Sequence, residues 1–162
     1  MCDYSLMAVP NRLAREGEEL VAHRFPTGSI GLASPADLRR IAEPKVESRT
    51  LWAELKRFFS PPPNRPVAAV CIPPGARLWV SDIPAHTQRD LGVRAAEEVT
   101  FTQLTAAANS YRDCIRFANG RVLRLQELRE GQRVQVLDLS CADSSVFEPF
   151  AEERAEFLYR VR

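Results

Sequence analysis

Turn-forming residues recur along most of this chain and limit the segments between them to a few residues each. The clearest turns are Pro26-Thr27-Gly28, Pro73-Pro74-Gly75, Asn119-Gly120 and Glu130-Gly131. Glycine accepts a positive φ, and proline fixes φ and removes a hydrogen-bond donor, so such sequences end strands and reverse the chain. The close spacing of these turns favours a fold of many short antiparallel strands.

The segments between the turns have the apolar alternation and β-branched content of short strands. Three hairpins are expected, and the last contains the strongest short-range hairpin signal, Asn-Gly. They comprise residues 19–25 with 29–33, 67–72 with 76–80, and 112–118 with 121–125. Further strands are expected at 2–9, 98–104 and 132–139. Eight or nine strands at this spacing predict a mainly β fold, either a small antiparallel β-barrel or a sandwich.

A helical, proline-rich stretch interrupts this pattern between residues 34 and 66. Half of the 12 prolines of the chain lie in it. Ser34 and Pro35 form a helix start, which predicts a short helix over 35–42. A second helix is expected over about 51–59, and a C-terminal amphipathic helix over 147–161. The chain is therefore predicted to be one domain, residues 1–162, with an insertion at 34–66 and α+β content.

Composition excludes several classes of function. The chain has 162 residues and a formal net charge of +1, which argues against nucleic-acid binding by bulk electrostatics. We expect a cytoplasmic protein with no membrane partner, because no secretory signal or membrane-spanning run is visible. Only His23 and His86 are present, so a three-histidine metal site is impossible. The four cysteines include no CxxC pair, so their spacing predicts neither a zinc finger nor a disulfide scaffold, and four reduced thiols are expected.

Cys2 is the position with the most distinctive chemistry. If Met1 is removed, Cys2 carries an α-amine beside its thiol, and their pKa values lie near 8 and 8.5, respectively. The pair could chelate a soft metal, or the amine could act as a base for a nucleophilic thiol. Cys2 is therefore a candidate catalytic residue, for example of an amidohydrolase. The alternative is a cysteine that only packs at a strand edge.

Four segments resemble a family of small bacterial proteins that begin MCDYS and have no established activity. They are CDYSL with Arg12 close behind it, HRFPTGSIGLAS at 23–34, AVCIPPGARL at 69–78 and RDCIRFANGRVLRLQELREGQRVQVLDL at 112–139. Shorter members of this family pass almost directly from the first hairpin to the AVC strand. The resemblance therefore implies that 34–66 is an insertion.

The segments that resemble this family contain two candidate sites. If the N-terminal strand lies beside 67–72, the sulfurs of Cys2 and Cys71 could meet. They would form a redox dithiol, or a site for a soft transition metal such as Cu(I), zinc or iron with His23 as third ligand. The second is a polar cluster of Asp3, Tyr4, Arg12 and Asp113 that either binds an anion or fixes one end of the fold.

A different class of function rests on the arginines of segment 112–133. Arg112, Arg116, Arg121, Arg124, Arg129 and Arg133 give this segment a basic character. They suggest a non-catalytic module that holds a protein or nucleic-acid partner, although the neutral chain makes nucleic acid the weaker choice. The alternative is an ordinary solvated hairpin face. The thiol site is the leading hypothesis.

Overall fold

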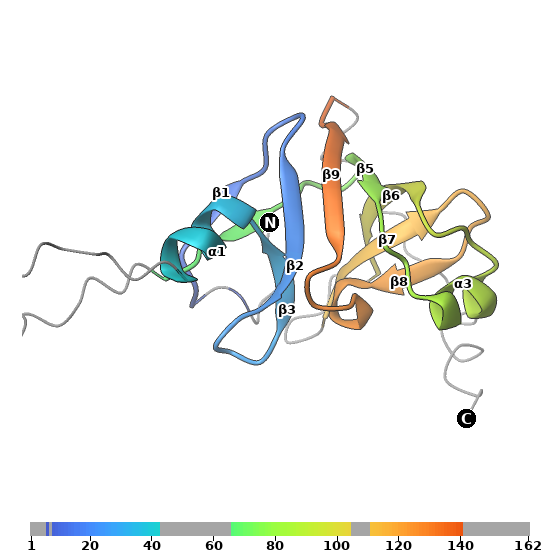
Figure 1. Cartoon of the computed structure of the whole chain (residues 1–162). Helices are drawn as coiled ribbons and strands as arrows, with labels where there is room; N and C mark the ends of the chain where they lie inside the picture. Colours follow the sequence, from blue (N-terminus) through green and yellow to red (C-terminus); the bar gives the residue numbers. More distant parts are fainter. Residues whose placement is uncertain (1–5, 7, 43–65, 105–110, 141–162) are drawn as a thin grey trace, which may run out of the picture.

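The protein is mainly β in the computed structural model, which describes residues 6, 8–42, 66–104 and 111–140. These residues contain nine strands in two sheets, two α-helices and a short 3₁₀ helix (Figure 1). The strands are β1 (Asn11–Leu13), β2 (Glu19–Arg24), β3 (Ile30–Ala33), β4 (Ala69–Cys71), β5 (Arg77–Val80), β6 (Glu97–Gln103), β7 (Asp113–Phe117), β8 (Val122–Arg124) and β9 (Arg133–Asp138). The helices are α1 (Pro35–Ala42), α3 (Ala85–Leu91) and the 3₁₀ helix η2 (Leu125–Glu127).

Seven strands form one antiparallel sheet in the order β3-β2-β9-β5-β6-β7-β8. The first and third predicted hairpins are confirmed as β2–β3 and β7–β8. Strand β9 pairs with both β2 and β5, and it thereby joins the N-terminal hairpin to the later strands. The last strand in sequence thus lies in the interior of the sheet.

One face of this sheet encloses the main hydrophobic core. Alternating residues point to it, as in a sheet with one buried face. The buried residues come from β2, β3, β4, β5, β6, β7, β9, the η2 turn and several connections, and they form a single cluster. Because residues from both ends of the sheet meet in one cluster, the sheet curls around its core.

The two ends of the curled sheet are joined by a side chain. Strands β3 and β8 do not pair, so no ladder closes the sheet within the described residues. Gln126, in η2, accepts a hydrogen bond from the backbone N–H of Ile30 at 2.8 Å and donates one to its C=O at 2.7 Å. The Gln126 amide thus takes the place of a neighbouring strand at this position of β3.

The second predicted hairpin is wrong. Strand β4 pairs in parallel with β1, whereas β5 pairs with β6 and β9. After the Pro73-Pro74-Gly75 turn the chain continues into β5, which lies between β6 and β9 and not beside β4. Gly75 N–H donates to Phe101 C=O at 2.9 Å, and Phe101 N–H donates to Ala76 C=O at 2.8 Å.

Other expectations differ in smaller ways. Strand β1 and helix α3 were not among the expected elements. Of the predicted strand 2–9, the described residues 6, 8 and 9 form no strand. The helix over 35–42 is confirmed as α1. Helices 51–59 and 147–161 lie outside the described residues.

Candidate functional site

Cys71 is the last residue of β4, and it is disulfide-bonded. Only 6% of its surface is exposed. The other cysteine in the described part of the chain, Cys114, is buried and takes part in no disulfide, so the partner of Cys71 lies outside that part. Cys71 is therefore cross-linked, and the expectation of a reduced thiol is wrong at this position.

The segment before β1 is held against the strand that carries Cys71. In the parallel pairing, Leu13 lies opposite Cys71. Ala14 N–H donates to Cys71 C=O at 3.0 Å, and Ala69 N–H donates to Pro10 C=O at 2.8 Å. Leu13, which lies on the same face as Cys71, is 69% exposed, whereas Ala69 and Cys71 on that face of β4 are buried.

A second hydrophobic cluster lies on the opposite face of β2–β3 from the main core. We call it the outer cluster, and its buried members are Leu6, Val9, Phe25, Ala33 and Ala69. A Cβ on Gly31 would lie 2.6 Å from Leu6 Cδ1, so Leu6 occupies the space that the missing side chain leaves. Because side chains alternate along a strand, Cys71 lies on the same face of β4 as Ala69.

His23 points to the same face of β2 as Phe25. Their rings meet edge to face with centroids 5.1 Å apart. His23 Nδ1 lies 3.7 Å from Glu130 Oε1, a contact that was not foreseen. The described residues contain no group of three His, Cys, Asp or Glu side chains that could hold a metal ion. The predicted set of Cys2, Cys71 and His23 includes Cys2, which lies outside those residues.

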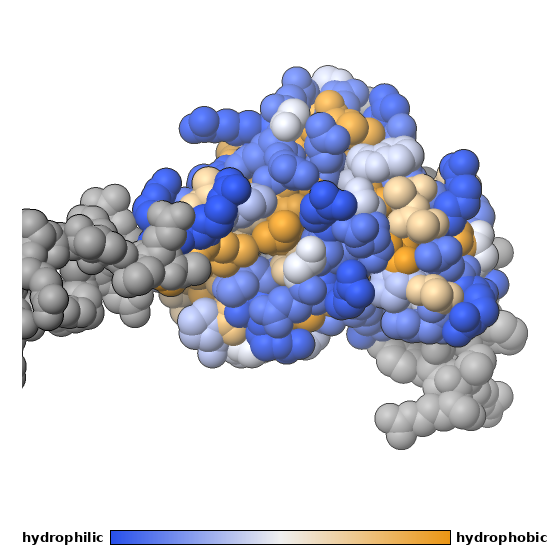
Figure 2. Space-filling view, viewed as in Figure 1, coloured by the Kyte–Doolittle hydropathy of each residue, from blue (hydrophilic) through white to orange (hydrophobic). Residues whose placement is uncertain are grey.

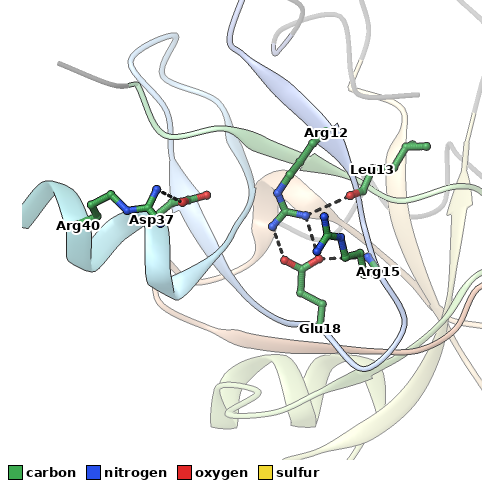
Figure 3. Close-up of polar contacts among 6 residues, drawn as sticks. All are labelled: Arg12, Leu13, Arg15, Glu18, Asp37 and Arg40. Carbon is green, nitrogen blue, oxygen red and sulfur yellow. Dashed lines mark hydrogen bonds and ion pairs between the residues drawn. The ribbon is translucent and has the colours of Figure 1, made fainter. Parts of the chain in front are cut away.

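Arg12 belongs to a compact polar network at the start of β2 (Figure 3). Its guanidinium forms a two-point ion pair with Glu18 and donates to Leu13 C=O at 3.1 Å. Arg15 N–H donates to Glu18 Oε2 at 3.1 Å. The Arg12 hydrogen bonds lower the pKa of Glu18 despite partial burial, and the Arg15 N–H acts in the same direction.

The predicted polar cluster is only partly placed by the structure. Asp113 lies on β7, where it is buried and accepts a hydrogen bond from Gln103 Nε2 at 2.9 Å. Arg12 lies on β1, in the other sheet, and its ion-pair partner is Glu18. Asp3 and Tyr4 lie outside the described residues. The contact between Arg12 and Glu18 could have been found from the sequence, because Gly17 indicates a turn that brings residues 12 and 18 together.

The arginines of segment 112–133 do not line one continuous surface. Arg116 and Arg124 lie on one face of the β7–β8 hairpin. Arg133, however, lies on β9, which β5 and β6 separate from β7, and its Nε is 3.0 Å from Asp82 Oδ2. On the face shown in Figure 2, hydrophobic residues form separate patches among hydrophilic ones. These observations do not favour one extended docking surface.

No family model, curated protein or solved structure matches this chain. The site therefore has to be interpreted from its own residues. Among the described residues, no helix is long and apolar enough to cross a membrane.

Proposed function

We propose that Cys71 is one half of a thiol–disulfide redox site and that Cys2 is the other half. The observation that carries this proposal is the disulfide at Cys71, in a chain whose other described cysteine takes part in no disulfide. Cys71 is buried but does not belong to the main-core cluster, so thiol–disulfide exchange there is proposed to proceed without unfolding of that core.

The position of Leu6 supports Cys2 as the partner. Leu6 belongs to the outer cluster together with Ala69, which is two residues before Cys71 on the same face of β4. Cys2 precedes Leu6 by four residues, and four extended residues span at most roughly 14 Å. Two strand residues span only about 7 Å, so Cys2 is within reach of Cys71.

The proposed reaction is reversible exchange with an external dithiol. A thiolate of the dithiol attacks one sulfur of the protein disulfide, forms a mixed disulfide and releases the other sulfur as a thiolate. The second thiol of the reductant then displaces the remaining protein sulfur. Two electrons pass to the protein, and the reductant leaves as a disulfide.

The scaffold of this site is a small barrel that is closed by a side chain. One core receives residues from both ends of the seven-stranded sheet, and Gln126 connects the β3 edge to η2, which follows β8. The outer cluster lies on the opposite face of β2–β3 from this core, and β4 contributes to both clusters, Ala69 to the outer cluster and Val70 to the main core.

Alkylation before and after reduction, followed by mass spectrometry, tests this proposal. Denatured but unreduced wild-type protein should alkylate at Cys114 and Cys141 only, and a non-reducing digest should contain a peptide that joins Cys2 to Cys71. The matched control Cys114→Ser should keep this linked peptide, and Cys2→Ser should lose it. Four alkylated cysteines without reduction would overturn the proposal, and a Cys71–Cys141 peptide would overturn the choice of Cys2.

The reduction potential separates a redox site from a structural cross-link. Equilibration with glutathione buffers should give a midpoint of roughly −180 to −270 mV, which is the range of exchanging protein disulfides. A value below about −300 mV would identify a structural disulfide and reject the redox function.

Soft-metal binding is the second candidate, and it applies to the reduced site. Two thiols and an imidazole suit Cu(I) or zinc. The contact between His23 Nδ1 and Glu130 favours it, because metal-binding histidines commonly have a carboxylate on the other ring nitrogen. Zinc titration of reduced wild type and His23→Ala should show a loss of affinity in the variant. Equal affinities would exclude His23 as a ligand.

A further inference from the structure

A row of exposed side chains crosses the face of the seven-stranded sheet that is turned away from the main core. It runs over four neighbouring strands, from Glu19 on β2 through Gln135 on β9 and Trp79 on β5 to Glu98 on β6, and each residue is the register partner of the next. We call these four residues the Trp79 row. Trp79 is 39% exposed, and the exposed Leu137 lies diagonally across from it on β9. Exposed tryptophans of this kind commonly contribute most to binding at protein interfaces.

Two arginines beside the Trp79 row are each held by carboxylates of the same chain. Arg77 Nε lies 2.6 Å from Glu98 Oε1, and Arg77 Nη1 lies 3.8 Å from Asp138 Oδ2. Arg133 Nε lies 3.0 Å from Asp82 Oδ2. The hydrogen bond from Arg77 lowers the pKa of Glu98, so this carboxylate is ionised at neutral pH. The positive charges on this part of the sheet are therefore matched by negative ones.

The charge next to the row is negative in sum. Glu19 is a fourth carboxylate, and its charge raises the pKa of Arg133 after the larger effect of Asp82. Two guanidiniums and four carboxylates give a local net charge of −2, whereas the whole chain carries +1. Arg116 and Arg124 share this face, but they lie two and three strands beyond β5. These separations are roughly 10 and 14 Å, which exceed the Debye length of about 8 Å at physiological ionic strength.

We infer that the Trp79 row binds an extended, arginine-containing segment of a partner protein. Guanidinium groups stack on indole faces and donate hydrogen bonds to carboxylates. An arginine stacked on Trp79 would lie beside Glu98, whose carboxylate can accept further hydrogen bonds in addition to the one from Arg77. A second arginine of the segment would meet Glu19 at the other end of the row. The inference is independent of the disulfide, because none of the four strands contains a cysteine.

Other classes of partner fit this face less well. A nucleic acid would bring its phosphates against a local excess of carboxylates, and the two would repel each other. A sugar could stack on Trp79, but it would leave the excess negative charge uncompensated. An arginine segment matches both features of the face, the exposed indole and the negative charge.

Fluorescence titration of the full chain with a synthetic peptide tests this inference. The chain has two tryptophans, so the variant Trp52→Phe leaves Trp79 as the only reporter. The probe is a capped peptide in which arginine alternates with serine, and its control carries uncharged citrulline in place of each arginine. We expect saturable changes in Trp79 fluorescence with the arginine peptide at millimolar concentration. The citrulline peptide, maltohexaose and oligothymidylate should leave the fluorescence unchanged.

Calorimetric titration of single variants separates stacking from charge. We expect Trp79→Leu to weaken binding of the arginine peptide about fivefold, and Trp79→Phe to retain part of the affinity. Glu19→Gln should weaken binding about two- to fivefold without any change at the indole. The matched controls Tyr111→Leu and Asp90→Asn alter an exposed aromatic and an exposed carboxylate elsewhere, and they should bind as wild type does.

The inference would be overturned by equal binding of the arginine and citrulline peptides. Equal affinities of Glu19→Gln and Asp90→Asn would also overturn it, because the carboxylate of the row would then have no specific role. This comparison stays valid if Trp79→Leu fails to fold. Saturable binding of the sugar or of the oligonucleotide, without binding of the arginine peptide, would assign this face to another class of partner.

Discussion

Glu18 holds the connection between β1 and β2 through contacts with residues on both sides of the turn. Arg12 contributes a two-point ion pair, and the backbone N–H of Arg15 contributes a third hydrogen bond (Figure 3). The Glu18 side chain is only 17% exposed, so these contacts are screened less than those of an ordinary surface pair. These contacts hold the connection between β1, which pairs with β4, and β2 of the seven-stranded sheet.

We predict that Glu18→Gln destabilises the protein by about 1–2 kcal/mol at neutral pH, because it removes the charge from these hydrogen bonds. The pKa of Glu18 is lower in the folded protein than its ordinary value. Its contribution is therefore complete above the ordinary pKa and is lost as the pH falls through the folded value. Urea unfolding from neutral pH into that acidic range should show the wild type and the variant converging.

The exposed neighbour Glu19 supplies the control for this experiment. Glu19→Gln makes the same change in charge, and we expect it to alter stability by no more than about 0.5 kcal/mol. A constant difference between wild type and Glu18→Gln at all pH values would contradict the assigned role of the carboxylate.

At the scale of elements, the edge of β3 depends on one amide. Both backbone groups of the buried residue Ile30 pair with Gln126. We predict that Gln126→Leu costs about 2–3 kcal/mol, because it leaves a buried N–H and C=O without partners. Gln135→Leu, at an exposed position of β9, should change stability by less than about 0.5 kcal/mol. Equal urea midpoints for the two variants would show that Gln126 does not close the sheet.

Elements whose partners are close in sequence could be predicted, and those with distant partners could not. The Asn119-Gly120 turn specifies β7–β8 because two residues fix both the turn type and the register. The partner of β4 depends on the fold as a whole: β1 lies more than 50 residues earlier, and a proline-rich turn looks alike whether it closes a hairpin or only redirects the chain. Helix α3 was missed although Pro84 and Gly92 mark its ends.

The candidate site was also predictable only where the signal is local in sequence. The sequence identified Cys71 as a candidate because of its residue type and its place in a strand, and the structure adds its disulfide. Glu130 beside His23 and Gln126 beside Ile30 join residues about a hundred positions apart. No local sequence pattern predicts such contacts, because they depend on the pairing of β9 with β2 and β5.

At the scale of the whole molecule, burial is divided between a large core inside the curled sheet and a small cluster outside it. We expect stability to follow this division, because proteins open locally in contiguous cooperative units. Leu78 is fully buried in the main core, and Leu6 is 4% exposed in the outer cluster. The same change, leucine to alanine, therefore probes both units.

We predict that Leu78→Ala lowers the free energy of unfolding by about 2–5 kcal/mol and reduces protection from hydrogen exchange at both Val9 and Val136. Leu6→Ala should reduce protection at Val9, whose N–H donates to Leu6 C=O, far more than at Val136, whose N–H donates to Glu18 C=O, because the main sheet stays folded when the outer cluster opens. Hydrogen exchange on the two variants under native conditions measures both amides. Equal losses of protection at Val136 would mean that the outer cluster and the main core unfold as one unit, and the disulfide would then stabilise the whole molecule.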